Sequence, residues 1–251
     1  MNKATVLDQL VRMSLELARP ENDYVILGEG NTSAKIDNQS FYVKASGSYL
    51  CNAGPDTFVQ VRRDRALELL DCGEMGDIGI RDHLASAIIG DTNLRPSVET
   101  VLHAFCLGLP DVNFIGHTHP TAVNAILCSK DAEEVVEGRI FPDEIVYCGI
   151  RPVYIPYVDP GIKLARELRI RALAFADHEG IPPKVILMQN HGFIALGKTP
   201  HEVLAITAMW VKTAKVLAGA QLFGGARYFT EENVQRIYTR PDELYRKGLL
   251  H

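Results

Sequence analysis

Short turns join several apolar segments of this chain, and they restrict how its strands can pair. The apolar runs Lys184–Met188 and Phe193–Leu196 are separated by only four residues, and Ala34–Ile36 and Phe41–Lys44 flank a second short turn. Strands joined so closely must run antiparallel, because parallel neighbours need a crossover of about a dozen residues. Segments with helical periodicity alternate with these strands. The sequence therefore predicts an α/β fold in which helices cover a mixed, mainly antiparallel sheet.

Helices are expected wherever apolar residues recur at helical spacing. In the first segment Leu7, Leu10, Val11 and Leu17 share one face, and Pro20 follows the end of the helix. Further helices are predicted over 62–71, 82–89, 96–107, 120–129, 161–175, 200–218 and 231–238, and further strands over 57–61, 112–117 and 151–155. Neither a repeat nor a linker interrupts the chain. We expect one domain over residues 1–251, with a polar C-terminal extension from about residue 224.

Composition excludes several classes of function. The chain has 26 Lys and Arg against 31 Asp and Glu, so its net charge of −5 argues against a nucleic-acid partner. We expect no membrane segment, because charges interrupt the apolar runs before they reach the roughly 18 residues of a spanning helix, and the start has no apolar signal core. Five scattered cysteines are typical of reduced, buried thiols. Reduced thiols are typical of proteins in the cytoplasm, so we expect a cytoplasmic location.

Two histidines stand at the end of one predicted strand, in the segment Gly116-His117-Thr118-His119-Pro120. Alternate residues of a strand point to the same face, so His117 and His119 project together. Neighbouring imidazoles suit a divalent metal, above all Zn²⁺. The alternative is a pair of partly exposed polar residues, and spacing alone does not decide between the two.

A third histidine and a carboxylate can complete such a site. His191 lies in a turn between two apolar strands, from which its side chain can reach outward. Glu99 lies in the first turn of the helix expected after Pro96, where the helix dipole also favours a carboxylate. Three histidines and one carboxylate are a suitable donor set for a catalytic divalent metal. The other histidines lack partners at useful spacing and are interpreted as structural or surface residues: His83, His103, His178, His201 and His251.

Three short segments offer hydrogen-bond donors to an anion. The glycine-rich segment Gly28–Ser33 lacks the third glycine of a dinucleotide fingerprint, but it contributes backbone and side-chain donors, including Asn31. The segment Lys44-Ala45-Ser46-Gly47 adds an ammonium, a hydroxyl and a glycine, and Ser97 adds donors at an expected helix N-terminus. Each segment alone is an ordinary turn or cap. Together they predict a pocket for phosphate or carboxylate.

The order of these motifs resembles the class II aldolase/adducin family, which includes L-fuculose-1-phosphate and L-rhamnulose-1-phosphate aldolases. The resemblance covers about residues 5–220. It rests on five motifs in register: Gly30-Asn31-x-Ser33, Ser46-Gly47, Ser97-x-Glu99, His117-x-His119 and Asn190-His191-Gly192. The residues of the Ser97 and His117 motifs are most similar to those in the aldolase part of proteins that join an aldolase to a dehydrogenase.

The resemblance implies a three-layer α/β/α sandwich around a mostly antiparallel sheet, and a homotetramer with active sites between subunits. It implies that His117, His119 and His191 hold the metal, with Glu99 as resting ligand and catalytic acid/base. Zn²⁺ is the expected ion, with Mn²⁺ or another transition metal as alternatives. Some members use a tyrosine from a neighbouring subunit, and Tyr147 lies in the corresponding stretch.

The resemblance also maps a phosphate pocket onto four residues, namely Asn31, Ser46, Gly47 and Ser97. Two departures weaken that assignment. Val98 stands where sugar-phosphate aldolases usually carry a second serine, and the acidic Glu29 lies in the first donor loop. A carboxylate in place of the phosphate therefore stays open.

Three functions compete on this evidence. The favoured one is a metal-dependent lyase that cleaves a C–C bond in a phosphorylated ketose or related hydroxy-carbonyl compound through an enediolate, whose charge the metal stabilises. A decarboxylase or epimerase would use the same site. A non-catalytic interaction module like adducin is the third, and the complete set of candidate ligands speaks against it.

Overall fold

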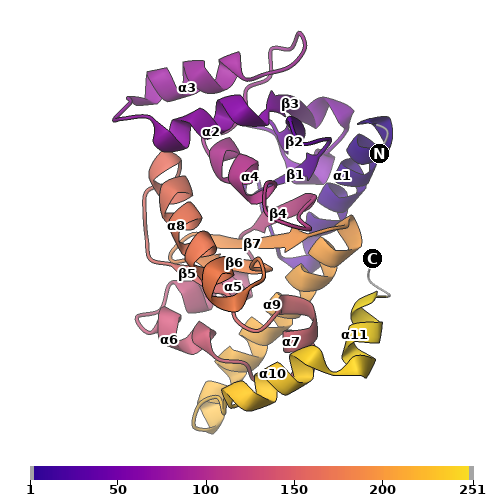
Figure 1. The fold of residues 1–251 in the computed structure, drawn as a ribbon, viewed down its shortest axis with the longest axis vertical. Coiled ribbons are helices and arrows are strands. Elements are labelled where there is room, and N and C mark those ends of the chain that lie inside the picture. The colour runs from indigo at the N-terminus through magenta and orange to yellow at the C-terminus, as the bar shows by residue number, and fades with distance from the viewer. Residues whose placement is uncertain (1–2, 249–251) are drawn as a thin grey trace.

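The computed structural model describes residues 3–248, and a seven-stranded sheet lies at its centre (Figure 1). The strands follow the order β3-β2-β1-β4-β7-β6-β5. Among the described residues, β5 and β6 run parallel and every other neighbouring pair is antiparallel. The predicted mixed, mainly antiparallel sheet is therefore confirmed. The strand bounds are β1 (Asn31–Lys35), β2 (Ser40–Lys44), β3 (Phe58–Arg62), β4 (Phe114–Thr118), β5 (Val153–Ile155), β6 (Val185–Met188) and β7 (Gly192–Gly197).

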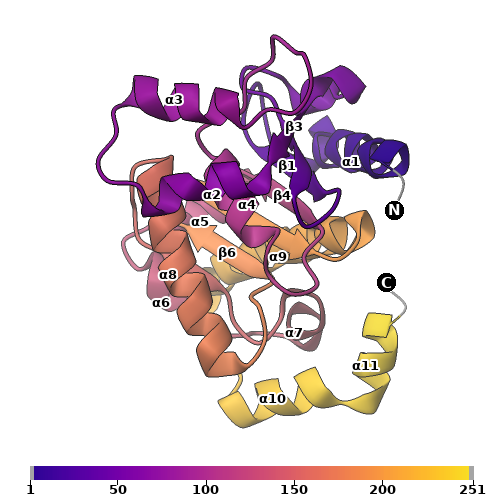
Figure 2. The same ribbon diagram turned by 45° about the horizontal axis from the view of Figure 1, so that its top comes forward.

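Helices cover both faces of the sheet, as expected for an α/β/α sandwich. On one face α1 and α9 pack on β1, β4 and β7, and on the other α2, α4 and α8 pack together over β2, β3 and β5 (Figure 2). The helices are α1 (Lys3–Leu17), α2 (Arg63–Asp71), α3 (Asp77–Ser86), α4 (Thr100–Cys106), α5 (Thr121–Leu127), α6 (Ala132–Glu137), α7 (Pro142–Cys148), α8 (Ile162–Glu179), α9 (Pro200–Ala220), α10 (Glu231–Thr239) and α11 (Pro241–Gly248).

Strand β6 shows how the sequence builds two cores. All four of its residues are buried. Val185 and Leu187 face the cluster under α1 and α9, whereas Ile186 and Met188 face the cluster under α4 and α8. Successive side chains of a strand point to opposite faces, so a continuously apolar strand belongs between two helical layers.

The helix after Pro96 begins later than the sequence predicts. Pro96 pairs with Ala45 in an isolated β-bridge, and the backbone N–H of Ser46 donates to the carbonyl of Arg95 over 2.7 Å. This extended pairing holds residues 95–96 outside the helix, so α4 starts only at Thr100. The expectation that Ser97 lies at the helix N-terminus is therefore wrong.

Other differences concern element boundaries. The segment expected as a turn over residues 28–33 ends early, because β1 begins at Asn31. Helix α3 spans Asp77–Ser86 rather than 82–89, and α6, α7 and α11 were not expected. Beyond residue 224, α10 packs on α7 through Val234, which contacts Ile145 and Ile150. The ends of the predicted domain, residues 1–2 and 249–251, lie outside the described part.

Helix α9 and the residues after it, up to Phe223, are long and apolar enough to cross a membrane by length and composition. Its buried side chains include Val203, Ile206 and Trp210, which pack with the apolar residues of the sheet and of α1. We therefore interpret α9 as a core helix. The five cysteines are all free, which agrees with reduced thiols, but the expectation that they are buried is wrong for Cys51 and Cys128, which are exposed.

Candidate metal centre

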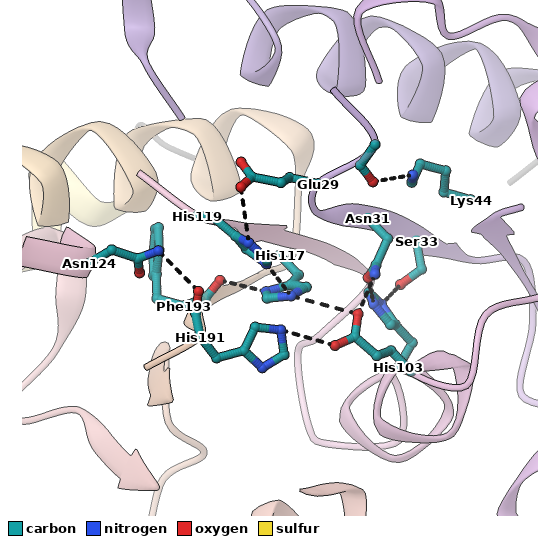
Figure 3. Close-up of polar contacts among 12 residues, drawn as sticks. Glu29, Asn31, Ser33, Lys44, His103, His117, His119, Asn124, His191 and Phe193 are labelled. Atoms are coloured by element: carbon teal, nitrogen blue, oxygen red, sulfur yellow. Dashed lines mark hydrogen bonds and ion pairs between the residues drawn. The ribbon is translucent and has the colours of Figure 1, made fainter. Parts of the chain in front are cut away.

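Three histidines converge at one end of the sheet (Figure 3). His117 lies on β4, between β1 and β7, and His119 follows the end of that strand. His191 lies in the turn between β6 and β7. Their ring centroids are 4.7–5.0 Å apart, and one nitrogen of each ring lies within 4.8 Å of the other two. The predicted grouping of these histidines is confirmed, and the group could hold a metal ion.

Two glycines let the neighbouring chain approach the histidine strand. A Cβ atom on Gly192 would lie 2.6 Å from the carbonyl oxygen of Thr118 and 2.7 Å from Cδ2 of His119. On the other side, a Cβ on Gly30 would lie 2.5 Å from the carbonyl oxygen of His117, and Gly30 has a φ of +65°. Larger residues at either position would displace the histidines, which explains physically why these motifs carry glycine.

The hydrogen bonding and the lowered pKa values of His117 and His119 suit them to bind a cation. Nδ1 of His117 donates to the carbonyl oxygen of Phe193 over 3.0 Å, and this bond leaves the ring's lone pair on Nε2, which lies 3.0 Å from Nε2 of His119. Burial lowers the pKa of His117 to about 4. Burial, followed by the neighbouring His117 and His191, lowers the pKa of His119 to about 3. Neutral imidazoles are the form that ligates a metal, so these residues fit a divalent cation.

Surrounding groups fix His119 and His191. The backbone N–H of His119 donates to the carbonyl of Tyr24 over 2.9 Å, and Nδ1 of His119 lies 3.9 Å from Oε1 of Glu29. The Asn124 amide donates to the carbonyl oxygen of His191 over 3.1 Å. Glu29, which the sequence suggested would repel an anion, therefore faces a histidine. Carboxylates in this position are common partners of metal-binding histidines.

Glu99 lies at the N-cap of α4, beside the histidines. Its Oε1 is 3.2 Å from Nε2 of His191, and its Oε2 is 3.7 Å from Nε2 of His117. Burial raises the pKa of Glu99, but His117, His191 and the amide of Asn31 outweigh that effect and hold the pKa far below its ordinary value. The carboxylate is thus ionised and adjacent to the predicted ligands. The structure brings all four together.

Sequence reasoning missed His103, which was interpreted as structural or surface. It is fully buried on α4. Its Nδ1 lies 2.7 Å from Oγ of Ser33, and its Nε2 contacts Oδ1 of Asn31. Burial lowers the pKa of His103 to about 4, so the ring is neutral. The signal was available, because Glu99 and His103 are four residues apart and share one face of a helix.

The predicted anion-binding residues separate into two groups. Ser46 and Ser97 line one hollow of about 720 Å³. The Oγ atom of Ser97 is buried and has no hydrogen-bond partner within the described residues. Gly47, beside Ser46, has a φ of +78° and open space where a Cβ would lie. The amide of Asn31 instead contacts Glu99 and His103.

The charges around this hollow differ from those expected. Arg81 and Arg95 line it, together with Asp77. Lys44, the cation that the sequence suggested, instead donates to the carbonyl oxygens of Gly28 over 3.2 Å and Ser48 over 2.6 Å. The expected role of Lys44 in the anion pocket is therefore not supported, since its ammonium ties two loops together.

Tyr147 lies on α7, half-buried against the apolar cluster under α9. This position packs the ring into the core. A role for Tyr147 in proton transfer stays a prediction.

The fold and the histidine cluster together define the class of protein. Residues 8–218 match the model of the class II aldolase and adducin N-terminal domain. The chain belongs to this family, and its three histidines could hold a divalent metal ion, as is typical of the family. The resemblance inferred from the motifs is confirmed.

Curated relatives of the chain carry out different reactions, and all are distant. A protein of Bacillus subtilis described as an uncharacterized oxidoreductase, YuxG, is 30% identical over 80% of this chain, which spans only 29% of that relative's length. The 3-oxo-tetronate 4-phosphate decarboxylase of Haemophilus influenzae is 28% identical over 88% of this chain and 90% of its own. A methylthioribulose-1-phosphate dehydratase of Geobacillus kaustophilus is 28% identical over 80% of this chain and 86% of its own.

Solved structures support the fold. The N-terminal class II aldolase domain of a Thermoplasma acidophilum protein superposes with a TM-score of 0.67 at 27% identity, covering 84% of this chain and 93% of that one. An L-fuculose-1-phosphate aldolase from Thermus thermophilus gives a TM-score of 0.62 at 15% identity, covering 89% and 99%. The second likeness is one of fold alone.

Proposed function

We propose that the protein is a divalent-metal-dependent lyase that cleaves a C–C bond next to the carbonyl group of a phosphorylated ketose or related hydroxy-carbonyl compound. The observation that carries this proposal is the convergence of three histidines on an ionised carboxylate, Glu99. Zn²⁺ is the expected ion, with Mn²⁺ or another transition metal as alternatives. The family to which the chain belongs supports a small phosphorylated substrate.

In a retro-aldol cleavage, the histidines and Glu99 would have different roles. His117, His119 and His191 would hold a divalent cation, which supplies a Lewis acid that stabilises the negative charge of an enediolate. Glu99 lies beside these ligands with Oε1 3.2 Å from His191. We assign to Glu99 the transfer of a proton to and from the substrate. Cleavage leaves an aldehyde and an enediolate, and protonation of the enediolate carbon gives the second carbonyl product.

The substrate's anionic end would occupy the hollow that Ser46 and Ser97 line. The hydroxyl groups and the guanidinium groups of Arg81 and Arg95 favour a negative charge there. The second hydrogen of the Asn31 amide nitrogen remains available to a ligand, since the first is donated to Glu99. Binding energy from this remote group would position the reacting carbons.

Decarboxylation is the second candidate, and a specific relative favours it. The Haemophilus decarboxylase matches nearly the whole of its own length, and its name describes a 3-oxo acid phosphate. Loss of CO₂ from such a compound also leaves an enolate, so the same ligands would serve. The same ligands could also serve epimerisation, or the dehydration that the name of another relative describes, because these reactions use related chemistry. A non-catalytic, adducin-like role is disfavoured because the donor set is complete.

A substrate screen distinguishes these functions. The metal-loaded protein is incubated with a panel of phosphorylated ketoses and, separately, with 3-oxo acid phosphates, while aldehyde and CO₂ are measured. Aldehyde release from a ketose phosphate supports the lyase, and CO₂ release alone supports the decarboxylase. A metal-loaded protein that turns over neither panel would contradict both.

Assembly and location are part of the proposal. We expect one domain over residues 1–251 and a cytoplasmic homotetramer that partners neither nucleic acid nor membrane. The family resemblance supports the tetramer, and the free thiols support a reducing compartment. Light scattering at micromolar concentration measures the assembly.

A further inference from the structure

A line of three polar side chains, those of Ser33, His103 and Asn31, connects the interior of the protein to Glu99 (Figure 3). The hydroxyl of Ser33 lies 2.7 Å from Nδ1 of His103, whose Nε2 contacts Oδ1 of Asn31. The Asn31 amide nitrogen then donates to Oε2 of Glu99 over 2.6 Å. Ser33 and His103 are fully buried, and Asn31 is nearly so. Water therefore has little access to replace any of these bonds.

The donors and acceptors along this line can be assigned. Oδ1 of Asn31 is a carbonyl oxygen and only accepts, so Nε2 of His103 must carry the proton. In a neutral ring Nδ1 then accepts, so the hydroxyl of Ser33 donates to it. This arrangement leaves the amide nitrogen of Asn31 directed toward the carboxylate of Glu99. Every hydrogen bond in the line is made with one consistent polarity.

The opposite orientation of the amide would be unfavourable at both ends. Rotating the Asn31 amide by half a turn would place its oxygen against the ionised Glu99 and its nitrogen against the N–H of His103. Both contacts are repulsive, and a buried polar group without a partner costs about 1–3 kcal/mol. The N–H of His103 therefore acts together with the carboxylate of Glu99 to hold the amide oxygen away from Glu99.

We propose that His103 is a positioning residue for Glu99. By fixing the Asn31 amide, it holds Oε2 of Glu99 in a hydrogen bond and leaves Oε1, the oxygen beside His191, for proton transfer. This inference rests on the proposed function, in which Glu99 moves the proton. It also gives Asn31 a structural partner that an anion-binding role alone does not require.

Two substitutions of His103 test the proposal as a matched pair. In His103→Gln the side-chain amide reaches the place of Nε2 and can donate to Asn31. In His103→Asn the shorter amide reaches only the place of Nδ1. We expect His103→Asn to lower kcat by roughly 10–100-fold, the scale for a lost partner of a metal site, with little change in KM. His103→Gln should restore most of that loss. His83→Asn controls for removing a half-buried histidine elsewhere.

Two readouts do not depend on turnover. Both variants should bind one Co²⁺ per chain, but the visible absorption spectrum of the Co²⁺ in His103→Asn should differ from that of the wild type and of His103→Gln. In the Zn²⁺-loaded wild type, long-range ¹H–¹⁵N spectra should show His103 as the Nε2–H tautomer, with its signals identified by their loss in His103→Gln. The tautomer itself is measured on the wild type, and His103→Gln serves only to assign the signals.

Distinct outcomes overturn the two ideas. If His103→Asn and His103→Gln lose turnover equally, or if the ring is the Nδ1–H tautomer, the positioning role is wrong. The same holds if His103→Asn is normal while Glu99→Gln is inactive. If Glu99→Gln itself turns over normally, the proposed function of Glu99 fails instead.

Discussion

Gly192 and His119 are in such close contact that a single added methyl group would not fit between them. A Cβ on Gly192 would lie 2.7 Å from Cδ2 of His119 and 2.6 Å from the carbonyl oxygen of Thr118. The turn that carries His191 can therefore approach β4 only because the residue after the histidine is glycine. The distance between the candidate ligands depends on this position.

Gly192→Ala should consequently disturb the metal centre. The backbone oxygen of Thr118 cannot move without disturbing β4, so we expect overpacking to cost about 1–3 kcal/mol in the free energy of unfolding. Metal affinity should fall at the same time. Urea unfolding and metal titration measure the two effects. Gly219→Ala is the control, because a Cβ there meets nothing within 4 Å. Equal behaviour of the two variants would contradict the role of Gly192.

The histidine cluster should bind one divalent ion per chain. Elemental analysis of protein purified without chelator should find it, zinc above all, and X-ray absorption should give metal–nitrogen distances of ~2.0–2.1 Å. His119→Ala should lose the ion, whereas His201→Ala, on the exposed side of α9, should keep it. Removing the ion should also lower the Tm, since a ligand bound only to the folded state stabilises it. Metal-free protein with full activity would refute this site.

Glu99→Gln should separate metal binding from turnover. Three imidazoles remain in this variant, so it should keep much of its metal. Turnover should fall by roughly 10²–10⁴-fold, because the general acid/base is lost. Metal content and steady-state rates are measured on the same preparation. A rate near that of the wild type would move proton transfer to another group, and Tyr147 would be the next candidate.

Ser46→Ala combined with Ser97→Ala should impair recognition of the anionic group. Each substitution removes a hydroxyl that donates a hydrogen bond to the anionic group of the substrate, so kcat/KM for that substrate should fall roughly ten-fold or more. An uncharged analogue should be affected much less. The exposed Ser86, on α3, provides a control substitution. Equal losses for both substrates would mean that the two serines belong to ordinary turns.

Metal-free protein should lose stability on acidification. His103 and His117 have a pKa of about 4 and His119 of about 3, against an ordinary value of 6.5. Below pH 6.5 the unfolded chain therefore binds more protons than the folded chain, so the free energy of unfolding falls as the pH falls toward 4. Each group contributes up to about 1.4 kcal/mol per pH unit. His103→Gln should reduce the slope measured in urea, and His201→Asn should not.

The sequence was most informative where local pattern and tertiary structure agree. The short turns predicted the antiparallel pairing, and the alternation of His117 and His119 at the end of β4 indicated the histidine cluster. The late start of α4 could not be read from Pro96 and Ser97. It depends on a bridge between Pro96 and Ala45, two residues far apart in the chain.

The same limit applies to the polar neighbours of the site. Lys44 has the sequence context of an anion-binding cation, yet two backbone carbonyls occupy its ammonium. The spacing from Glu99 hints at His103, but its hydrogen-bond partner Asn31 could not be predicted, because Asn31 approaches from β1 at a sequence separation of 72. Contacts between distant segments decided both cases, and composition and periodicity carry no information about them.

The strand order has a consequence for how the protein is made. Strand β7 is the last strand within residues 3–248, yet it lies between β4 and β6. Until it emerges from the ribosome, His117 lies on the unpaired edge of a half-built sheet, and such edges invite pairing with other chains. The turn that brings His191 arrives immediately before β7. Insertion of this one strand therefore closes the exposed edge and completes the ligand set in the same step, so no shorter nascent chain can hold the ion with all three histidines.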